Sequence, residues 1–408
     1  HRLVLAPRPD LWTPHHIVPA RVPRLRGASL QADYLMVTHH RLRAALEPLA
    51  AFHRDRGLTV EIVEVREIFD EFSHGLVDPS AIRDFVVHAW RHWRSPRPRF
   101  LLLVGDASWD YKHGRGDDER YADWTYRPGE KRRFVKNAST PYSDDPGNRN
   151  LVPTWGYPHS EGKAAADTYF ACVEGDDLVP DLAVGRIPVV EPEELQAVVA
   201  KTIAYVERPE PGPWRRKLLF IANESSGFQR RSDAVAERFA EQGFIPLKVY
   251  PAGTDPVNEG HTRRIVELLD DGVAVVHFLG HGGRYIWRTG GIDLDKNHDL
   301  FTLEHLDRLE PTRRLPVVIS LTCYSAPFDH PTADSIGEKF LRMPDRGAVA
   351  VFAASWRNSP SATMGELLIE GLTTPGTTIG EAVLHTKQAL GNELLVQTYN
   401  LLGDPALP

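Results

Sequence analysis

Short apolar runs alternate with stretches of helical periodicity along this chain. In the first hundred residues, apolar positions spaced three and four apart predict amphipathic helices, and short β-branched runs predict buried strands. Strands that alternate with helices pair in parallel, so this region is predicted to be a β-α-β-α-β unit. The predicted elements are strands at 34–37, 59–65 and 100–104 and helices at 41–53 and 78–93.

From residue 106 to about residue 166 this periodicity gives way to a stretch rich in Gly, Pro, Asp and Tyr. A loop of that length in a folded domain is usually functional or ordered by a ligand, and we expect the same here. Strands are predicted again at 169–173 and 181–184, followed by a helix from Glu191 to about residue 207. The proline-rich segment 208–213 then stops helix and strand alike, which predicts a linker.

After this linker the same alternation restarts. The 408 residues exceed the size at which one hydrophobic core stops growing, so two halves are expected. We predict an α/β fold in which two halves with mainly parallel sheets and flanking helices lie side by side, preceded by an N-terminal extension (1–32) and divided into 33–207, a linker at 208–214, and 215–408. The second half is predicted to contain strands at 217–222, 245–250, 273–279, 315–321 and 348–353 and helices near 232–242, 262–270, 335–341, 365 and 379.

Composition narrows the class of protein. With 42% hydrophobic residues, 25% charged residues and a net charge of -7, the chain is typical of soluble globular proteins and not of nucleic-acid binders. No apolar run approaches the length of a membrane span. Two cysteines, Cys172 and Cys323, exclude a dense disulfide framework, and their spacing does not suit structural zinc. The start at His1 suggests a trimmed or processed piece.

Two of the apolar runs end in reactive side chains. The run 273–279 leads into His281, which lies between glycines, and the run 315–321 leads into Cys323. Parallel strands present their carboxyl ends at one sheet edge, so a thiol and an imidazole are expected to meet there as nucleophile and base. The backbone amides of Gly282 and Cys323 could bind an oxyanion. Glu224 follows the strand 217–222 and could orient the imidazole.

Each of these residues also has a simpler interpretation. Cys323 alone could be a small buried hydrophobe, His281 a turn residue, and Glu224 a carboxylate at a strand end. The occurrence of the thiol and the imidazole at matching strand ends favours the catalytic interpretation of that pair.

With these motifs the chain resembles the gingipain family of cysteine peptidases, in the caspase-like clan. The resemblance extends from about residue 34 to residue 408, and its strength lies in the order of several short motifs. They are Leu103–Asp106, Asp167–Phe170, Glu174–Asp177, Val184–Arg186, Ile221–Glu224, Gly280–Gly282 followed by Trp287, Thr322-Cys323, and Leu402–Pro405.

The resemblance implies a non-catalytic first caspase-like subdomain and a catalytic second one that cleaves polypeptides. It assigns Cys323 as the nucleophile, His281 as the base and Glu224 as the orienting acid. It also implies a secreted or cell-surface location, with a cytoplasmic one left open by the sequence, and no cofactor is required for the chemistry. Oligomeric state stays open.

Substrate contacts follow from the same resemblance. Asp233 is similar to an aspartate that pairs with a basic substrate side chain, and cleavage after Arg, or less well after Lys, is therefore expected. The alternative is that Asp233 caps a helix. The other expected substrate contacts are Trp356, Met364 and Trp287, the first two as apolar walls around the aliphatic stem of the basic side chain.

Calcium is a further expectation, because several members of the family are stabilised by it. Carboxylates supply the hard oxygen ligands that calcium prefers, although acidic loops are often simply solvated. The candidate ligands are Asp106, Asp110, Asp144, Asp145, Asp176 and Asp177.

Two departures from the family pattern leave alternatives open. Thr322 stands where the clan often has Ala, and Tyr324–Pro327 differs from the sequence that follows the family's nucleophile. The same thioester chemistry also supports a sortase-like transpeptidase, and a catalytically silent scaffold could keep the fold. Labelling of Cys323 by an activated peptide ketone would separate an enzyme from a scaffold, and an added amine would separate transfer from hydrolysis.

Overall fold

Four parallel strands form the sheet of the first half in the computed structural model, which describes residues 23–27, 29–109, 148–159, 162–252, 259–291, 298–331 and 333–408. The predicted parallel unit is confirmed. The strands are β1 (Tyr34–Thr38), β2 (Val60–Glu64), β3 (Phe100–Val104) and β6 (Ala183–Ile187). The helices are α1 (His40–Arg54), α2 (Val65–Phe72), α3 (Ser80–His92) and α4 (Pro192–Glu207).

The second half repeats this arrangement with five parallel strands. They are β7 (Lys217–Ala222), β8 (Ile245–Val249), β9 (Val275–Leu279), β13 (Val317–Leu321) and β14 (Ala350–Ala354). Its helices are α5 (Ser226–Glu241), α6 (Glu259–Asp271), α7 (Ile336–Arg342), α8 (Ala362–Thr373), α9 (Ile379–Leu390) and α10 (Glu393–Thr398). Short strands outside the main sheet are β4 (Gly156–His159), β5 (Gly162–Ala165), β10 (Gly282–Gly283), β11 (Ile286–Arg288) and β12 (Asp299–Thr302).

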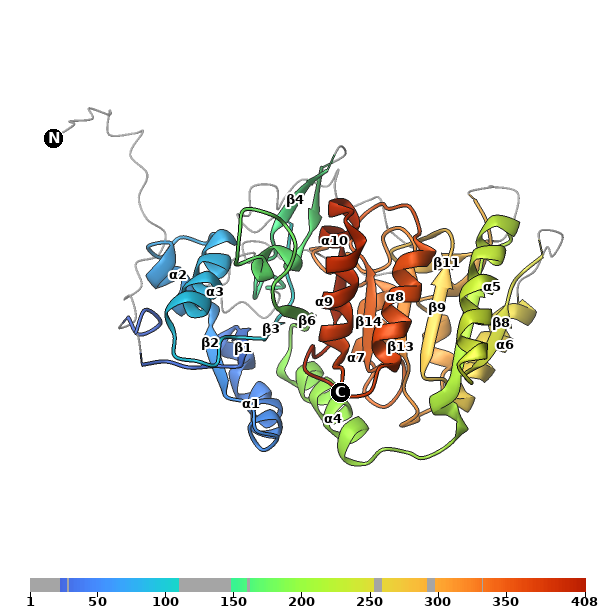
Figure 1. Ribbon diagram of the computed structural model, residues 1–408, viewed down its shortest axis with the longest axis horizontal. Coiled ribbons are helices and arrows are strands. Elements are labelled where there is room, and N and C mark those ends of the chain that lie inside the picture. The colour runs from blue at the N-terminus through green and yellow to red at the C-terminus, as the bar shows by residue number, and fades with distance from the viewer. Residues whose placement is uncertain are drawn as a thin grey trace.

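One further strand, β15 (Tyr399–Leu402), joins the two halves into a single sheet. It runs antiparallel to β14 and parallel to β6, so the described sheet has ten strands in the order β2-β1-β3-β6-β15-β14-β13-β9-β7-β8. Figure 1 shows the first half in blue and green beside the second in yellow to red. The predicted linker falls between α4 and β7.

Helices cover both faces of this sheet because its strands are apolar on both sides. Buried residues of α1, α4, α6 and α7 form one core that extends through both halves. On the opposite face, α2 and α3 cover the first half, while α5, α8 and α9 cover the second, where Figure 1 shows them in front of the strands. The predicted fold class is therefore confirmed.

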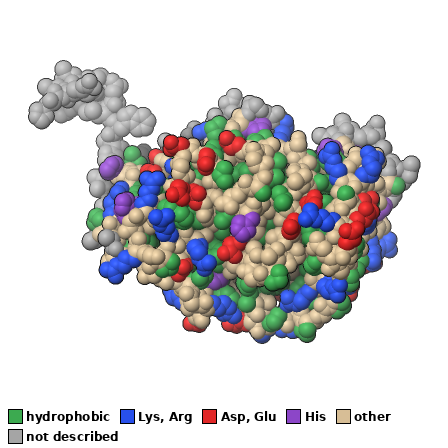
Figure 2. All heavy atoms as spheres, viewed as in Figure 1, with side chains coloured by type: hydrophobic (Ala, Val, Ile, Leu, Met, Phe, Trp, Pro, Cys, Tyr) green, Lys and Arg blue, Asp and Glu red, His purple; other side chains and the backbone are tan. Residues whose placement is uncertain are grey.

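Several predicted elements were wrong in detail. The predicted strand at 169–173 is a 3₁₀ helix (Asp167–Ala171), and α5 begins at Ser226, six residues before the predicted start. The region predicted as a loop up to residue 166 contains the β4–β5 hairpin, whose polar, Gly- and Pro-containing sequence lacks an apolar alternation. None of the described helices could cross a bilayer. Acidic and basic side chains are interspersed on the face drawn in Figure 2.

A buried ion pair lies where the two halves meet. Arg186, at the end of β6, is fully buried and binds Asp167 through two hydrogen bonds of 2.6 and 2.9 Å. Its Nη1 atom donates to the backbone carbonyls of Gly105 and Val152, at 2.7 and 2.8 Å. Thr154 donates to the carboxylate as well. The pair is therefore compensated on both sides, as a buried charge requires.

The Leu402–Pro405 motif has a structural role at the same junction. The Asp404 carboxylate accepts from the Tyr34 hydroxyl at 2.6 Å and lies 2.7 Å from His53 Nε2, so it connects β15 to β1 and α1. The motif glycine Gly185 allows close approach, since a Cβ there would lie 2.5 Å from the carbonyl oxygen of Gly403. These motifs thus hold the halves together.

One core residue makes stability depend on pH. Burial lowers the pKa of His277, in β9, to about 4, and neither ring nitrogen has a partner among the described residues. The unfolded chain therefore binds a proton below about pH 6.5 that the folded protein does not bind until about pH 4. We expect the free energy of unfolding to fall by about 2 kcal/mol between pH 7 and pH 5 from this group alone.

Urea unfolding at both pH values, compared with a His277→Leu variant, measures this contribution. The variant should lose less stability on acidification than the parent protein. An equal loss in the two proteins would mean that His277 titrates normally in the folded state.

Candidate active site

The three predicted catalytic residues follow three neighbouring strands. The last residues of β7, β9 and β13 are paired in one row across the sheet, and the chain leaves the sheet at this row in all three strands. Each candidate lies two residues beyond its strand end. The row is formed by Ala222, Leu279 and Leu321, and the residues beyond it are Glu224, His281 and Cys323.

Glycines let the three loops approach one another. A Cβ atom on Gly282 would lie 2.8 Å from the Thr322 side chain, so the loop with the imidazole touches the loop with the thiol. A Cβ on Gly290 would lie 2.3 Å from Glu224 Oε1, and the Glu224 amide donates to the Thr289 carbonyl at 2.5 Å. Side chains larger than glycine would push these loops apart.

Cys323 is half-buried, and its thiol donates to the backbone carbonyl of Asn358 at 3.1 Å. The next residue, Tyr324, has a φ of +59°, which is uncommon for a residue with a side chain. Its amide donates to the Trp356 carbonyl at 3.0 Å, and the two rings lie 5.1 Å apart. The chain therefore turns sharply after the thiol, and strain of this kind occurs at functional sites.

The imidazole of His281 is exposed, and the ring of Phe228 stands edge-on to it at 5.6 Å. Its backbone carbonyl accepts from the Arg288 amide at 2.9 Å, which closes the loop behind it. The ring is thus held from α5 while staying open to solvent. A general base that must reach a substrate needs this access.

Asp233 does not cap a helix, because α5 begins seven residues earlier. It lies inside that helix, and its carboxylate binds Lys248 Nζ at 2.5 Å and the Tyr250 hydroxyl at 3.2 Å. Both partners belong to β8 or follow it directly. The carboxylate is therefore already paired with a basic side chain.

Two predicted substrate contacts are contradicted by burial. Met364 is fully buried in the core between the sheet and α8, and Trp287 is fully buried and donates to Ser320 at 2.9 Å. Neither has exposed surface with which to contact a substrate. The apolar side chains of both residues serve core packing here. Trp356 is half-buried and contacts His159 and Tyr324, the residue that follows Cys323.

The expected calcium ligands do not form a site within the described residues, where no three metal-binding side chains gather. Asp106 is fully buried and paired with Arg149, which takes the place that a cation would occupy. Asp177 accepts from the Val179 amide in a turn that also contains Asp176. Asp110, Asp144 and Asp145 lie outside the described residues. Asp106 therefore does not fit a calcium site.

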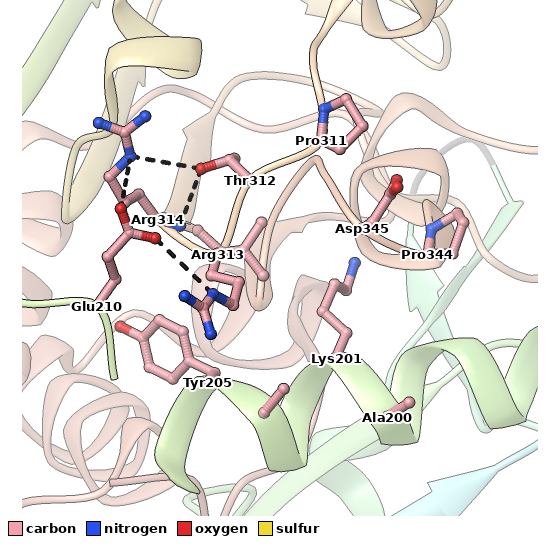
Figure 3. A pocket seen from close by; sticks show the side chains of 12 residues that line it. Ala200, Lys201, Tyr205, Glu210, Pro311, Thr312, Arg313, Arg314, Pro344 and Asp345 are labelled. Atoms are coloured by element: carbon pink, nitrogen blue, oxygen red, sulfur yellow. Dashed lines mark hydrogen bonds and ion pairs between the residues drawn. The ribbon is translucent and has the colours of Figure 1, made fainter. Parts of the chain in front are cut away.

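A pocket of about 550 Å³ lies at the opposite end of the strands from Cys323, where residues 311–315 precede β13 (Figure 3). Lys201 of α4 lines it, and its ammonium donates to the carbonyls of Leu341 and Met343 at 2.6 Å each. These carbonyls lie at the C-terminal end of α7, where the helix dipole favours a protonated amine, while burial lowers the pKa of Lys201 to about 7. The pocket is separate from the predicted catalytic edge.

The sequence did not predict the partners of two candidate residues, Asn358 for Cys323 and Arg149 for Asp106. Asn358 binds the thiol through its backbone carbonyl, which no side-chain pattern can reveal. Arg149 lies in a segment without periodicity, where a charged residue looks like any solvated one. Both partnerships depend on the fold bringing distant segments together.

The fold is similar to that of solved cysteine proteinases. Gingipain R, an Arg-specific cysteine proteinase, superposes with a TM-score of 0.66 over 96% of this chain and 80% of its own, at 17% sequence identity. The complex of the pro- and mature domains of Porphyromonas gingivalis RgpB gives a TM-score of 0.67 over 92% of this chain and 79% of that one, at 18% identity.

Sequence comparison points the same way. Gingipain R2 of Porphyromonas gingivalis is 22% identical over 269 residues, which are 59% of this chain and 34% of that protein, so the chain matches about a third of its length. An uncharacterized protein of Archaeoglobus fulgidus is 23% identical over 79% of this chain and 75% of its own. The model of peptidase family C25 matches residues 28–408, and the chain therefore belongs to this family.

Proposed function

We propose that this protein is a cysteine endopeptidase in which Cys323 is the nucleophile, His281 the general base and Glu224 the group that orients the imidazole. The observation that supports this most is the position of all three residues two places beyond one row of strand ends. Contacts between the three loops at Gly282 and Gly290 support it further.

In the proposed reaction His281 takes the proton of the thiol, and the sulfur attacks the carbonyl carbon of the scissile peptide bond. The tetrahedral intermediate collapses, the C–N bond breaks, and the imidazolium gives its proton to the leaving amine. Water, activated by the same imidazole, then hydrolyses the thioester and restores the thiol. To begin, the thiol exchanges its hydrogen bond with the Asn358 carbonyl for one with the imidazole.

The negatively charged oxygen of the tetrahedral intermediate requires hydrogen-bond donors that are already in place. We assign this role to the backbone amides of Gly282 and Cys323, which belong to the two loops that touch at Thr322. Such donors typically contribute about 3 to 4 kcal/mol to the stability of the transition state.

An activity-based probe tests the nucleophile directly. A peptide with a reactive ketone should label Cys323, as identified by mass spectrometry, and a His281→Ala variant should label much more slowly. Labelling of Cys172, or no labelling of the folded protein, would refute the proposal.

For substrate preference we propose cleavage after a basic residue, with Asp233 as the carboxylate that recognises it. The pairing of Asp233 with Lys248 and Tyr250 supports a site that accepts an ammonium group and a hydrogen-bond donor together. A substrate side chain would then compete with Lys248 for the carboxylate.

This competition gives a prediction with opposite signs for two variants. Asp233→Asn should lower kcat/KM for Arg substrates by about 10- to 100-fold, the equivalent of a charged hydrogen bond. Lys248→Met should raise the same constant, because it removes the competing cation. A peptide library measures both, with kcat/KM for neutral residues at the cleavage position as the control. A preference for acidic or bulky apolar residues that is unchanged in Asp233→Asn would contradict the assignment.

A further inference from the structure

Helix α7 begins where the two loops with the reacting groups meet. The amide of Ile336 donates to the carbonyl of Arg284 at 2.7 Å, and Arg284 lies three residues after His281. The next amide, of Gly337, donates at 3.0 Å to the carbonyl of Ser325, which lies two residues after Cys323. The first amides of a helix have no partner inside the helix, and in α7 two of them bind the two loops instead.

Other contacts make this junction rigid. Ser335 caps α7 by accepting from the Glu338 amide at 3.2 Å, and the Glu338 carboxyl accepts from the Ser335 amide at 2.7 Å. The Ser325 hydroxyl accepts from Ser320 of β13 at 2.9 Å. Arg284 also donates from its guanidinium to the carbonyl of Asp334. Any shift of α7 must therefore move both loops.

The first half holds this helix at both ends. At its start, Asp334 binds Arg149 at 2.7 Å, and Arg149 also binds Asp106, the residue that follows Gly105 at the end of β3. At its other end, Lys201 of α4 donates to the final carbonyls. Two basic side chains from the first half, Arg149 and Lys201, thus contact the two ends of a helix of the second half.

The ion pairs around the start of α7 contain acidic side chains of which one, Glu338, is mainly neutral. Arg149 and Arg342 face Asp106 and Asp334, and Arg342 binds Asp334 at 2.5 Å. Burial raises the pKa of Glu338 to about 8, so this carboxyl is mainly protonated at neutral pH. Asp106 and Asp334 then face the two guanidinium groups, and the partly exposed Glu194 lies 3.7 Å from Arg342. Loss of Arg149 leaves the buried Asp106 carboxylate without its paired counter-charge.

We propose that Arg149 is a positioning residue, which acts through Asp334 and α7 to set the separation of Cys323 and His281. The inference rests on the proposed function of these two residues. It gives the first half, which supplies no reacting group, a role in aligning those of the second.

The test measures coupling between thiol and imidazole without a peptide substrate. In the full chain with Cys172→Ala, the rate of alkylation by iodoacetamide is followed from pH 4 to pH 9. A thiolate stabilised by an imidazolium reacts at low pH, and this low-pH reactivity should be lost in His281→Ala. Arg149→Lys and Asp334→Asn should lower the rate at pH 6 by at least about tenfold while the protein stays folded, since one pKa unit changes the thiolate fraction tenfold.

His53→Gln is the matched control, because it weakens the contact of Asp404 with α1 but touches neither catalytic loop. It should lower the melting temperature and leave the alkylation profile unchanged. Profiles of Arg149→Lys and Asp334→Asn that overlay the parent profile, with His281→Ala still effective, would overturn the positioning role alone. If His281→Ala also leaves the profile unchanged, the result contradicts the proposed pairing of Cys323 with His281 and not only the role of Arg149.

Discussion

Replacement of Cys323 by alanine is expected to abolish peptide-bond hydrolysis. In the proposed mechanism the Cys323 sulfur forms the bond to the substrate, and the other cysteine of the chain, Cys172, is buried. Removal of the nucleophile in a catalytic set costs up to about a millionfold in kcat, and His281→Ala should cost nearly as much because the two act as a unit. Glu224→Gln should cost less, since an orienting group is partly replaceable.

Hydrolysis of a fluorogenic peptide, measured on purified protein, checks this prediction. Cys172→Ala is the control, because burial raises the pKa of that thiol to about 12 and its sulfur donates to the Thr168 carbonyl at 3.2 Å. The control should keep full activity. Full activity of Cys323→Ala in the absence of added thiols would end the peptidase proposal.

The largest expected effect on stability comes from Arg186. Arg186→Met should lower the free energy of unfolding by about 3 to 5 kcal/mol, because it leaves the Asp167 carboxylate buried without its counter-charge. The carbonyls of Gly105 and Val152 would also lose their donor. Urea unfolding followed by circular dichroism measures the loss.

The double variant Arg186→Met with Asp167→Leu separates charge from packing. Because it removes both charges, it should be more stable than Arg186→Met alone. A loss below about 1 kcal/mol in the single variant would show that water or rearrangement compensates the carboxylate.

Local sequence patterns were sufficient for the parallel strands and for the residues that follow them. The runs before His281 and Cys323 are apolar and β-branched on both faces, and a turn residue ends each one, so both the strands and their exits could be predicted. Glu224 was placed by the same reasoning. The structure puts all three beyond one row of the sheet.

The features that were missed depend on tertiary contacts. Nothing in the short run 399–402 indicates that it enters the sheet between β14 and β6, antiparallel to the first and parallel to the second. Trp287 and Met364 were predicted as substrate contacts but are buried in the core, because an apolar residue that lines a pocket and one that packs in a core look the same in the sequence. Arg149 and Asp334 are 185 positions apart in the sequence, and only the fold brings them together.

The position of β15 has a consequence for biosynthesis. This strand is made after the other nine strands of the described main sheet, yet it lies between β6 and β14. A nascent chain that has reached residue 398 therefore contains Cys323 and His281 but has two open strand edges in place of a closed junction. Such edges can pair with other chains, so stalled or prematurely released products should aggregate.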